Sequence, residues 1–231
     1  MKAIILVGGP ATRLHPLTLD KPKALIEFQG KTILEHVLDL FQKYDIDDIV
    51  LSTGYLKDQI RDHFKDGKDF GMNINYIEEN EPLGTAGPLN LIKKPKEACI
   101  VCNGDELKEI DIPKMLDFHK TSGAKATLAL RRVEDPSIYG VAEMHGTKIR
   151  SFVEKPKKEE APSNLINAGF YIMEPEVFDV IPKGRAMFEY DVFPKLASEG
   201  ALHGYEFDGQ WFDTGNHERL KRARDLWTPL K

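Results

Sequence analysis

Two glycines and a cluster of cations follow the first apolar segment of the chain. Residues 3–7 form a continuous apolar run, and Gly8 and Gly9 come directly after it. Glycine at this place lets backbone N–H groups approach an anion closely, because no side chain intervenes. Arg13 adds a planar guanidinium that can donate two hydrogen bonds to one phosphate. These residue types predict a phosphate-binding loop, although a Gly-Gly pair alone is also typical of an ordinary tight turn.

Further cations lie nearby, although the chain as a whole is acidic. Its formal net charge is −5, and Lys21 and Lys23 follow soon after Arg13. A sequence-specific DNA-binding protein usually has a basic surface, so nucleic acid is not expected as a partner. A negatively charged protein that binds phosphates must concentrate its positive charges locally. The loop contains neither the G-x-x-x-x-G-K-[ST] motif nor a complete G-x-G-x-x-G motif, the two common nucleotide-binding patterns.

Neither the cysteines nor the histidines form a metal-binding pattern. Cys99 and Cys102 have C-x-x-C spacing, but they lie in an apolar run that predicts a buried strand. Residues three apart in a strand point to opposite faces, and no neighbouring histidine or second cysteine pair completes a zinc site. No two histidines have H-x-x-x-H spacing. We therefore expect two reduced core thiols in a cytoplasmic protein.

The elements that must position these residues alternate between strand and helix in the first half. The run at 3–7 predicts a parallel strand buried on both faces, and Thr32 and Glu35 match a helix capping box. Further strands are expected at 46–52, 73–77 and 99–102, and helices at 33–41, 56–64 and 85–92. This order predicts an α/β fold, Rossmann-like, with a mostly parallel sheet between two helical layers (α/β/α). Ligands of such sheets bind beyond the carboxyl ends of the strands.

The second half has shorter strand-like segments joined by turns. They lie at 125–133, 139–143, 149–153 and 166–173, and helices are expected at 190–198 and 216–227. We interpret them as a smaller antiparallel or mixed extension of the sheet, within one domain over 1–231. The stretch 155–163, rich in Lys, Glu and Pro, is expected to be flexible. The N-terminal apolar run is too short for a membrane span or a signal peptide, so no membrane partner is expected.

Several motifs resemble those of the sugar-phosphate nucleotidyltransferases, in the order in which that family carries them. The family begins with a strand and G-G-x-G-T-R-L-x-P-L-T, followed by P-K-P-L. Here Gly8 to Thr18 read GGPATRLHPLT, and Pro22 to Leu25 read PKAL. The resemblance continues through PLGTAG at 82–87, NGD at 103–105, YGV at 139–141, FVEKP at 152–156, NAG at 167–169 and WFDTG at 211–215. It covers almost the whole chain and implies the fold of the nucleotide-diphospho-sugar transferases.

The resemblance also implies a reaction. In this family a sugar 1-phosphate attacks the α-phosphorus of a nucleoside triphosphate, and pyrophosphate leaves. The attacking phosphate is already a nucleophile, so catalysis depends on positioning and charge neutralisation. The resemblance implies that Arg13, Lys23 and Lys155 are the catalytic cations, and that Asp105 and Asp213 bind Mg²⁺, which accepts a few carboxylates together with phosphate oxygens.

The remaining site residues are assigned by the same resemblance. Residues 1–110 are expected to bind mainly the nucleotide and 111–231 mainly the sugar phosphate, with the key side chains in one cleft. The nucleotide set is Leu6, Gly8, Gly9, Ala11, Thr12, Arg13, Gly84 and Thr85, and the sugar-phosphate set is Lys23, Gly140, Glu154, Lys155 and Asn167. Other roles stay open for some of them: Asp105 could cap a helix, Asp213 could form a turn, and the lysines could be solvated surface residues.

The choice of substrates is less determined. The segments 167–171 and 190–194 look more like mannose-1-phosphate guanylyltransferases, which favours GTP and mannose 1-phosphate, although Tyr190 stands where those enzymes often have a lysine. Glucose 1-phosphate with UTP or dTTP is the alternative, and short relatives also use phosphocholine or heptose phosphates. Longer members add a left-handed β-helix, for which we expect no room here. A homo-oligomer stays open.

Ala11 replaces the third loop glycine of the family. If that position needs a positive φ, alanine is strained there; if the glycine allows close approach, a methyl group crowds the triphosphate. Pro10 also removes one N–H donor. A regulatory paralogue that binds a nucleotide-sugar without turnover is therefore an alternative. An enzyme is favoured by the retained residues Arg13, Lys23, Asp105, Asp213 and Lys155. A dinucleotide-dependent oxidoreductase is a third interpretation, but the complete G-x-G-x-x-G motif that binds a dinucleotide is missing.

Overall fold

The computed structural model describes residues 1–230, in two units formed from interleaved segments of the chain. Unit 1 comprises Met1–Pro82, Cys102–Ile110 and Gly209–Lys231, and unit 2 comprises Leu83–Val101 and Asp111–Asp208. Unit 1 thus includes the C-terminal segment from Gly209, and unit 2 includes the segment Leu83–Val101 from the first half of the sequence. The division into a nucleotide half and a sugar-phosphate half is a functional assignment and stays a prediction.

A parallel sheet forms the centre of unit 1. Strand β1 (Lys2–Leu6) pairs in parallel with β4 (Asp48–Thr53), which pairs in parallel with β5 (Asn73–Glu78). Ala3, Ile4 and Ile5 are fully buried, as expected for a β-branched strand with both faces covered. The predicted buried first strand is therefore confirmed, and its carboxyl end leads into the expected phosphate loop.

Helices and short strands complete unit 1. Helix α1 (Ile33–Gln42) begins at Thr32, whose Oγ1 accepts a hydrogen bond from Glu35 N at 3.2 Å while Thr32 N donates to Glu35 Oε2 at 2.5 Å. The predicted capping box is confirmed. The other elements are α2 (Lys57–Phe64), α5 (His217–Leu226), β2 (Glu27–Phe28), β3 (Lys31–Thr32) and the 3₁₀ turns η1 (Thr12–Leu14), η2 (Lys23–Leu25) and η3 (Lys68–Phe70).

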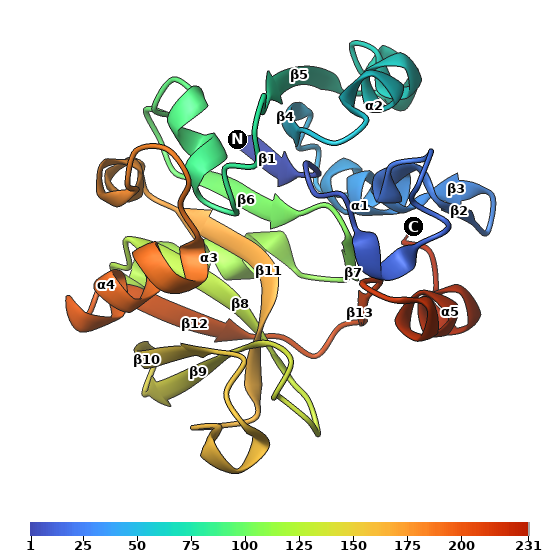
Figure 1. Ribbon diagram of the computed structural model, residues 1–231. Helices are drawn as coiled ribbons and strands as arrows, with labels where there is room; N and C mark the ends of the chain where they lie inside the picture. Colours follow the sequence, from blue (N-terminus) through green and yellow to red (C-terminus); the bar gives the residue numbers. More distant parts are fainter. Residues whose placement is uncertain (231) are drawn as a thin grey trace. The chain divides into compact units, whose positions relative to one another are not determined.

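A second, two-stranded sheet joins distant parts of the sequence within unit 1. Strand β6 (Cys99–Asn103) is followed by β7 (Glu106–Lys108), which pairs in antiparallel fashion with β13 (Trp211–Asp213). Figure 1 shows these two strands side by side, one green and one red. The pairing brings the NGD and WFDTG motifs together.

Unit 2 contains a mixed sheet. Its strand order is β11 (Leu165–Met173), β8 (Ala126–Arg132), β12 (Leu202–Glu206), β10 (Lys148–Glu154) and β9 (Gly140–His145). Strands β8 and β12 are parallel and the other neighbours are antiparallel. Helices α3 (Ile112–Ser122) and α4 (Phe193–Ser198) pack on β12. The predicted α/β class, with a parallel part and an antiparallel extension, is confirmed.

Several expected elements are wrong in type or length. The helix expected at 85–92 is a 3₁₀ turn, η4 (Gly87–Leu91), in which Pro88 near the start cannot donate a backbone hydrogen bond. The helix expected at 190–198 begins as a π-helical turn, η7 (Phe188–Val192), that continues into α4. The stretch 155–163, whose expected flexibility stays a prediction, contains the 3₁₀ turn η5 (Lys158–Glu160), and a further one, η6 (Pro175–Val180), follows β11.

Both cysteines are free thiols in the core, as predicted. Burial raises the pKa of Cys102 to about 11, against the opposing effect of the nearby Lys108 ammonium. Over residues 1–230, no helix has the length and apolar character needed to cross a membrane.

Candidate functional site

The two glycines after β1 have different surroundings. A Cβ on Gly8 would lie 2.5 Å from Glu79 Oε1, and the Gly8 carbonyl accepts a hydrogen bond from Tyr55 N at 3.0 Å. Gly8 is therefore packed inside unit 1, where a side chain would have to displace the Glu79 carboxylate. A Cβ on Gly9 would meet no atom within 4 Å, so the Gly9 backbone faces open space. Of the two, Gly9 is the residue whose backbone a ligand can approach.

Ala11 has the left-handed backbone conformation that favours glycine. Its φ is 47° and its ψ is 46°, a region in which a Cβ contacts the backbone unfavourably. The Ala11 carbonyl accepts hydrogen bonds from Thr18 Oγ1 at 2.9 Å and from Leu14 N at 3.0 Å. The loop thus needs a positive φ at this position, and the alanine is strained there.

Arg13 is an accessible cation beside the turn that carries Asp213. Its side chain has no hydrogen bond or ion pair with any residue in the range 1–230. Its Nη2 lies 3.5 Å from the place of a Cβ on Gly215, and Gly215 N donates to Asp213 Oδ1 at 2.6 Å. The guanidinium therefore has its donors available for an anion at this turn.

Asp105 lies on a turn that packs against the end of β1. Gly104 N donates to Leu6 O at 3.0 Å, and a Cβ on Gly104 would lie 2.4 Å from Val7 Cγ1. Lys23 Nζ donates to Asp105 Oδ2 at 2.8 Å; the lysine side chain is 7% exposed and the aspartate side chain 48% exposed. Lost hydration raises the pKa of Asp105, but the charge and hydrogen bond of Lys23 outweigh it and hold this pKa below its ordinary value. Asp105 is thus an ionised and accessible carboxylate.

Asp213 is held beside the same turn. It stands opposite Glu106 in the β7–β13 pair, and Thr214 Oγ1 donates to Asp105 O at 2.7 Å. Arg219 Nη1 donates to Asp213 Oδ2 at 2.5 Å. The alternative of Asp105 as a helix cap is wrong, because strand β7 follows it. The alternative of Asp213 as a turn residue is confirmed by its hydrogen bond from Gly215 N.

Three further residues of this cluster were not expected from the sequence. Arg219 pairs with Asp213, and Glu106 accepts hydrogen bonds from Asn103 Nδ2 at 2.9 Å and Trp211 Nε1 at 3.0 Å. Burial raises the pKa of Glu106, which the buried Lys108 opposes. The alternation of Glu106 and Lys108 along a strand is a signal that both point to one face. No sequence signal marks Arg219.

In unit 2, Glu154 ends strand β10 opposite Gly140, and Lys155 follows it directly. A Cβ on Gly140 would lie 2.9 Å from Glu154 Oε2 and 2.3 Å from Phe152 Cζ, so only glycine fits there. Lys155 has a φ of 47°, a strained conformation that proteins often place at functional sites. Its Nζ donates to Glu154 Oε1 at 2.5 Å, with the lysine side chain 59% exposed. Lys155 is thus a cation that reaches solvent from a fixed backbone.

Asn167 lies at an irregularity in strand β11. The β11–β8 register shifts between Asn167 and Tyr171, as in a β-bulge, and bulges re-aim side chains. Asn167 Nδ2 donates to Tyr171 OH at 2.8 Å, and its Oδ1 accepts from Gly169 N at 3.0 Å. The amide keeps one N–H and one lone pair for a ligand hydroxyl.

The loop with Gly84 and Thr85 is hydrogen-bonded to the π-helical turn η7. Gly84 has a φ of 83°, and a Cβ on it would lie 2.4 Å from Ala186 O. Thr85 Oγ1 accepts from Phe188 N at 2.9 Å and donates to Glu189 Oε2 at 2.8 Å. Burial, followed by the charge of Glu154, raises the pKa of Glu189. Glu189, which the sequence reasoning missed, therefore lies near Thr85 and Glu154.

The expected site residues divide between the two units. Unit 1 holds Leu6, Gly8, Gly9, Ala11, Thr12, Arg13, Lys23, Asp105 and Asp213, and unit 2 holds Gly84, Thr85, Gly140, Glu154, Lys155 and Asn167. Their individual roles stay predictions. In the part of the chain that the structure describes, no group of three or more His, Cys, Asp or Glu side chains could hold a metal ion by itself. A metal bound by two carboxylates would need further ligands from a substrate or water.

Comparison with known proteins identifies the relationships of the chain. The sequence model of the family described as "Nucleotidyl transferase" matches residues 2–228. Mannose-1-phosphate guanyltransferase 2 of Candida glabrata is 42% identical over 98% of this chain, which spans 64% of that relative's length. A putative glucose-1-phosphate thymidylyltransferase of Bacillus anthracis, solved in complex with a sucrose, has a TM-score of 0.88 and 28% identity, and the match covers 97% of this chain and 94% of that one. HddC of Yersinia pseudotuberculosis, complexed with GMP-PN, has a TM-score of 0.82 and 28% identity, with coverage of 97% and 98%.

Proposed function

Because the chain belongs to the nucleotidyl transferase family, we propose that it transfers a guanylyl group from GTP to mannose 1-phosphate. The products are GDP-mannose and pyrophosphate. The observation that carries the proposal is the cluster in unit 1, where the unpaired Arg13 and the accessible Asp105 lie beside the Gly9 loop. The guanyltransferase of Candida glabrata and the GMP-PN complex of HddC support the choice of base and sugar.

The proposed reaction joins two polyanions. An oxygen of the sugar phosphate forms a bond to the α-phosphorus, and the bond from that phosphorus to the bridging oxygen breaks, so its electron pair leaves with pyrophosphate. No side chain has to act as nucleophile, and the main barrier is charge repulsion. Arg13 has free donors for the triphosphate, and Lys23 places a buried positive charge beside Asp105. Both residues thus lower the repulsion without proton transfer.

Asp105 and Asp213 fit a magnesium site that is completed by substrate. Mg²⁺ is usually bound by one or two carboxylates together with phosphate oxygens and water. Asp105 offers an ionised carboxylate with free lone pairs, and Lys23 and Arg219 balance the charge of the two aspartates. When bound there, the ion would supply positive charge to the phosphate oxygens.

The residues of unit 2 suit the sugar phosphate. Lys155 presents an accessible ammonium for the phosphate, held by its backbone and by Glu154. The Glu154 carboxylate can accept hydrogen bonds from sugar hydroxyls, and Asn167 can both donate and accept. Gly140 leaves room beside Glu154.

A matrix of substrates tests the proposal. Purified protein is incubated with Mg²⁺, one of GTP, UTP or dTTP, and mannose or glucose 1-phosphate, and pyrophosphate release is measured. We expect the highest kcat/KM for GTP with mannose 1-phosphate. Highest turnover with glucose 1-phosphate and UTP or dTTP would contradict this choice and support the second candidate, which the likeness to the Bacillus anthracis protein favours.

The same matrix addresses a regulatory role. The strained Ala11 favours this third candidate, a protein that binds nucleotide-sugar without turnover. Isothermal titration with GDP-mannose, run alongside the assay, separates the cases. Micromolar or tighter binding without pyrophosphate release from any substrate pair would overturn the proposed enzyme and support the regulatory protein.

A further inference from the structure

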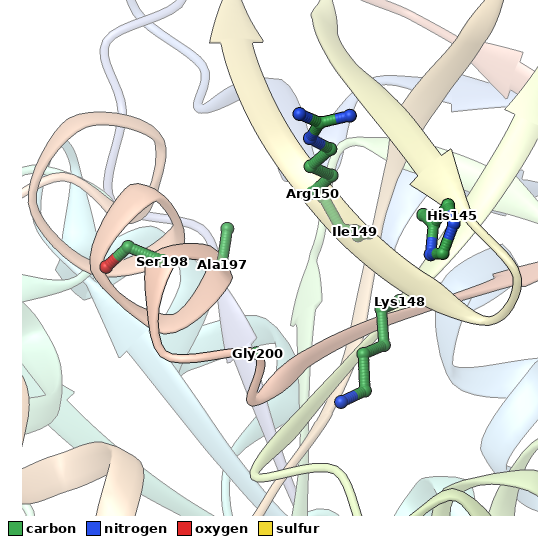
Figure 2. A pocket seen from close by; sticks show the side chains of 7 residues that line it. All are labelled: His145, Lys148, Ile149, Arg150, Ala197, Ser198 and Gly200. Carbon is green, nitrogen blue, oxygen red and sulfur yellow. The ribbon is translucent and has the colours of Figure 1, made fainter.

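Unit 2 contains a cavity formed by residues that the proposed reaction does not use. Its volume is about 440 Å³, within the range of about 300–1,000 Å³ typical of small-molecule sites. It lies between the β9–β10 hairpin and the end of α4, as Figure 2 shows. The lining residues are His145, Lys148, Ile149, Arg150, Ala197, Ser198 and Gly200.

The lining of this cavity carries positive charge and no carboxylate. Lys148 and Arg150 are exposed, and neither side chain makes a hydrogen bond or ion pair with any residue from 1 to 230. The nearest acid in sequence, Glu199, is paired with Lys125 at 3.7 Å. In a chain with a net charge of −5, two uncompensated cations on one cavity favour an anionic ligand.

Both cations lie on strand β10, and a bulge in that strand sets the direction of one of them. The β10–β9 register passes from the Ile149–Met144 pair to the Ser151–Glu143 pair, which leaves Arg150 as the extra residue of a β-bulge. Bulges re-aim the side chain at the extra position. In Figure 2, Lys148 and Arg150 extend from one strand and the His145 ring lies on the neighbouring strand.

The turn after α4 closes the other side. Lys148 Nζ lies 3.6 Å from the place of a Cβ on Gly200, and burial together with the charge of Lys148 lowers the pKa of His203. Gly200 N donates to Ala197 O at 3.0 Å, and Ser198 Oγ donates to Lys195 O at 2.7 Å. The Gly200 N–H and the Ser198 hydroxyl are therefore used in hydrogen bonds within the turn. The donors that remain for an anion are those of the Lys148 and Arg150 side chains.

The cavity also has an apolar part. Of its two apolar lining residues, Ala197 is 8% exposed and Ile149 is fully buried behind the surface, so the apolar area that a ligand can reach is small. A small-molecule site typically combines apolar walls with a few polar groups that fix orientation. From the volume and the unpaired side-chain cations, we propose that this cavity binds a small molecule that carries a phosphate group, at a site formed by β9, β10 and the end of α4.

An amide NMR titration tests this site. Labelled protein is titrated with inorganic phosphate and, separately, with GMP, while sodium chloride keeps the ionic strength constant. We expect saturable shifts of the Lys148, Arg150 and Gly200 amides. In the variant Lys148→Glu/Arg150→Glu the affinity at these amides should fall at least about tenfold, because two charge-assisted contacts are lost.

The matched control carries the same change of charge elsewhere in unit 2. Lys93→Glu/Lys96→Glu alters two exposed lysines whose side chains make no hydrogen bond or ion pair with residues 1–230, and it should bind like the unaltered protein. Tighter binding of GMP than of phosphate at Gly200 assigns the site to an organic phosphate, and equal binding assigns it to the free ion. The proposal is overturned if neither probe gives saturable shifts at these amides, or if Lys148→Glu/Arg150→Glu binds as tightly as the control.

Discussion

At the scale of single residues, Ala11 has a backbone conformation that favours glycine, although the residue at this position is alanine. Its φ of 47° suits glycine, and a left-handed conformation costs a residue with a Cβ about 1–2 kcal/mol. Hydrogen bonds to its carbonyl from Thr18 and Leu14 hold the loop in this shape. The surrounding structure therefore offsets the strain and keeps Arg13 in place after the turn.

Ala11→Gly should stabilise the protein. The relief of strain exceeds the extra backbone entropy of glycine in the unfolded chain, and we expect a gain of about 0.5–1 kcal/mol in the free energy of unfolding. Urea denaturation measures this gain. The control is Ala161→Gly, because Ala161 has an ordinary φ of −64°; this change should lower the stability slightly. A loss of stability in Ala11→Gly equal to that in the control would show that Ala11 is not strained.

Asp105→Asn should abolish most of the proposed turnover. The change removes the negative charge that a metal needs and leaves the buried Lys23 with a weaker partner. We expect pyrophosphate release from GTP and mannose 1-phosphate to fall by about 100-fold or more, as for other lost electrostatic contacts in transfer reactions. Circular dichroism should show a folded protein.

The control for this prediction is Asp117→Asn, which alters an exposed carboxylate on α3 that has no side-chain partner within residues 1–230. It should leave turnover unchanged. Turnover in Asp105→Asn equal to that of the control would remove Asp105 from the proposed metal site. A titration of turnover with Mg²⁺ adds a readout that a purely structural role would not move.

At the scale of elements, the contact between the Gly84–Thr85 loop and η7 depends on one hydroxyl. Thr85→Val removes the acceptor of Phe188 N and the donor to Glu189. A buried donor left without a partner costs about 1–3 kcal/mol, and we expect the urea-derived free energy of unfolding to fall by that amount. Thr85→Ser keeps the hydroxyl and should lose less than half as much. A loss in Thr85→Ser as large as that in Thr85→Val would contradict the assignment of this stability to the hydroxyl.

Local patterns predicted the elements that have local causes. The buried strand at Ala3–Val7 and the capping box at Thr32 follow from residue type and short spacing, and the structure confirms both. The helix expected at 85–92 failed because Pro88 and tertiary hydrogen bonds from the loop to Ala186 override the local pattern. The strands at 106–108 and 211–213 stabilise each other across the chain, and each is too short to be recognised alone.

The residues of the candidate site also divide into those that the sequence could predict and those that it could not. Gly9 and Arg13 could be proposed from their types and their place after a strand, and Asp105, Asp213 and Lys155 from motif resemblance. The ion pairs Lys23–Asp105 and Arg219–Asp213 could not, because they form between elements distant in sequence. The same holds for the bond between Thr85 and Glu189. Residue types indicate which side chains can do chemistry, whereas their partners depend on tertiary packing.

At the scale of the whole molecule, buried histidines link folding to pH. His36 belongs to unit 1, and His119 and His203 belong to unit 2. All three are almost fully buried, and burial is the largest cause that lowers the pKa of each. Both tryptophans, Trp211 and Trp227, are in unit 1, so their fluorescence reports unfolding of that unit, whereas circular dichroism reports both.

Stability should therefore fall as the solution is acidified below the ordinary histidine pKa of about 6.5. Above that pH the imidazoles are neutral in the folded and unfolded chains, and their contribution is complete. Below it, the unfolded chain binds protons that the folded chain takes up only at lower pH, so the free energy of unfolding decreases. We expect the urea midpoint to decrease between about pH 7.5 and about pH 5.5 by both fluorescence and circular dichroism.

His119→Gln, which can keep hydrogen bonds to Thr127 and Glu174, should flatten the decrease seen by circular dichroism. His145→Gln at an exposed position should not change it. A midpoint that stays constant or rises on acidification would show that the buried imidazoles do not limit stability in this range.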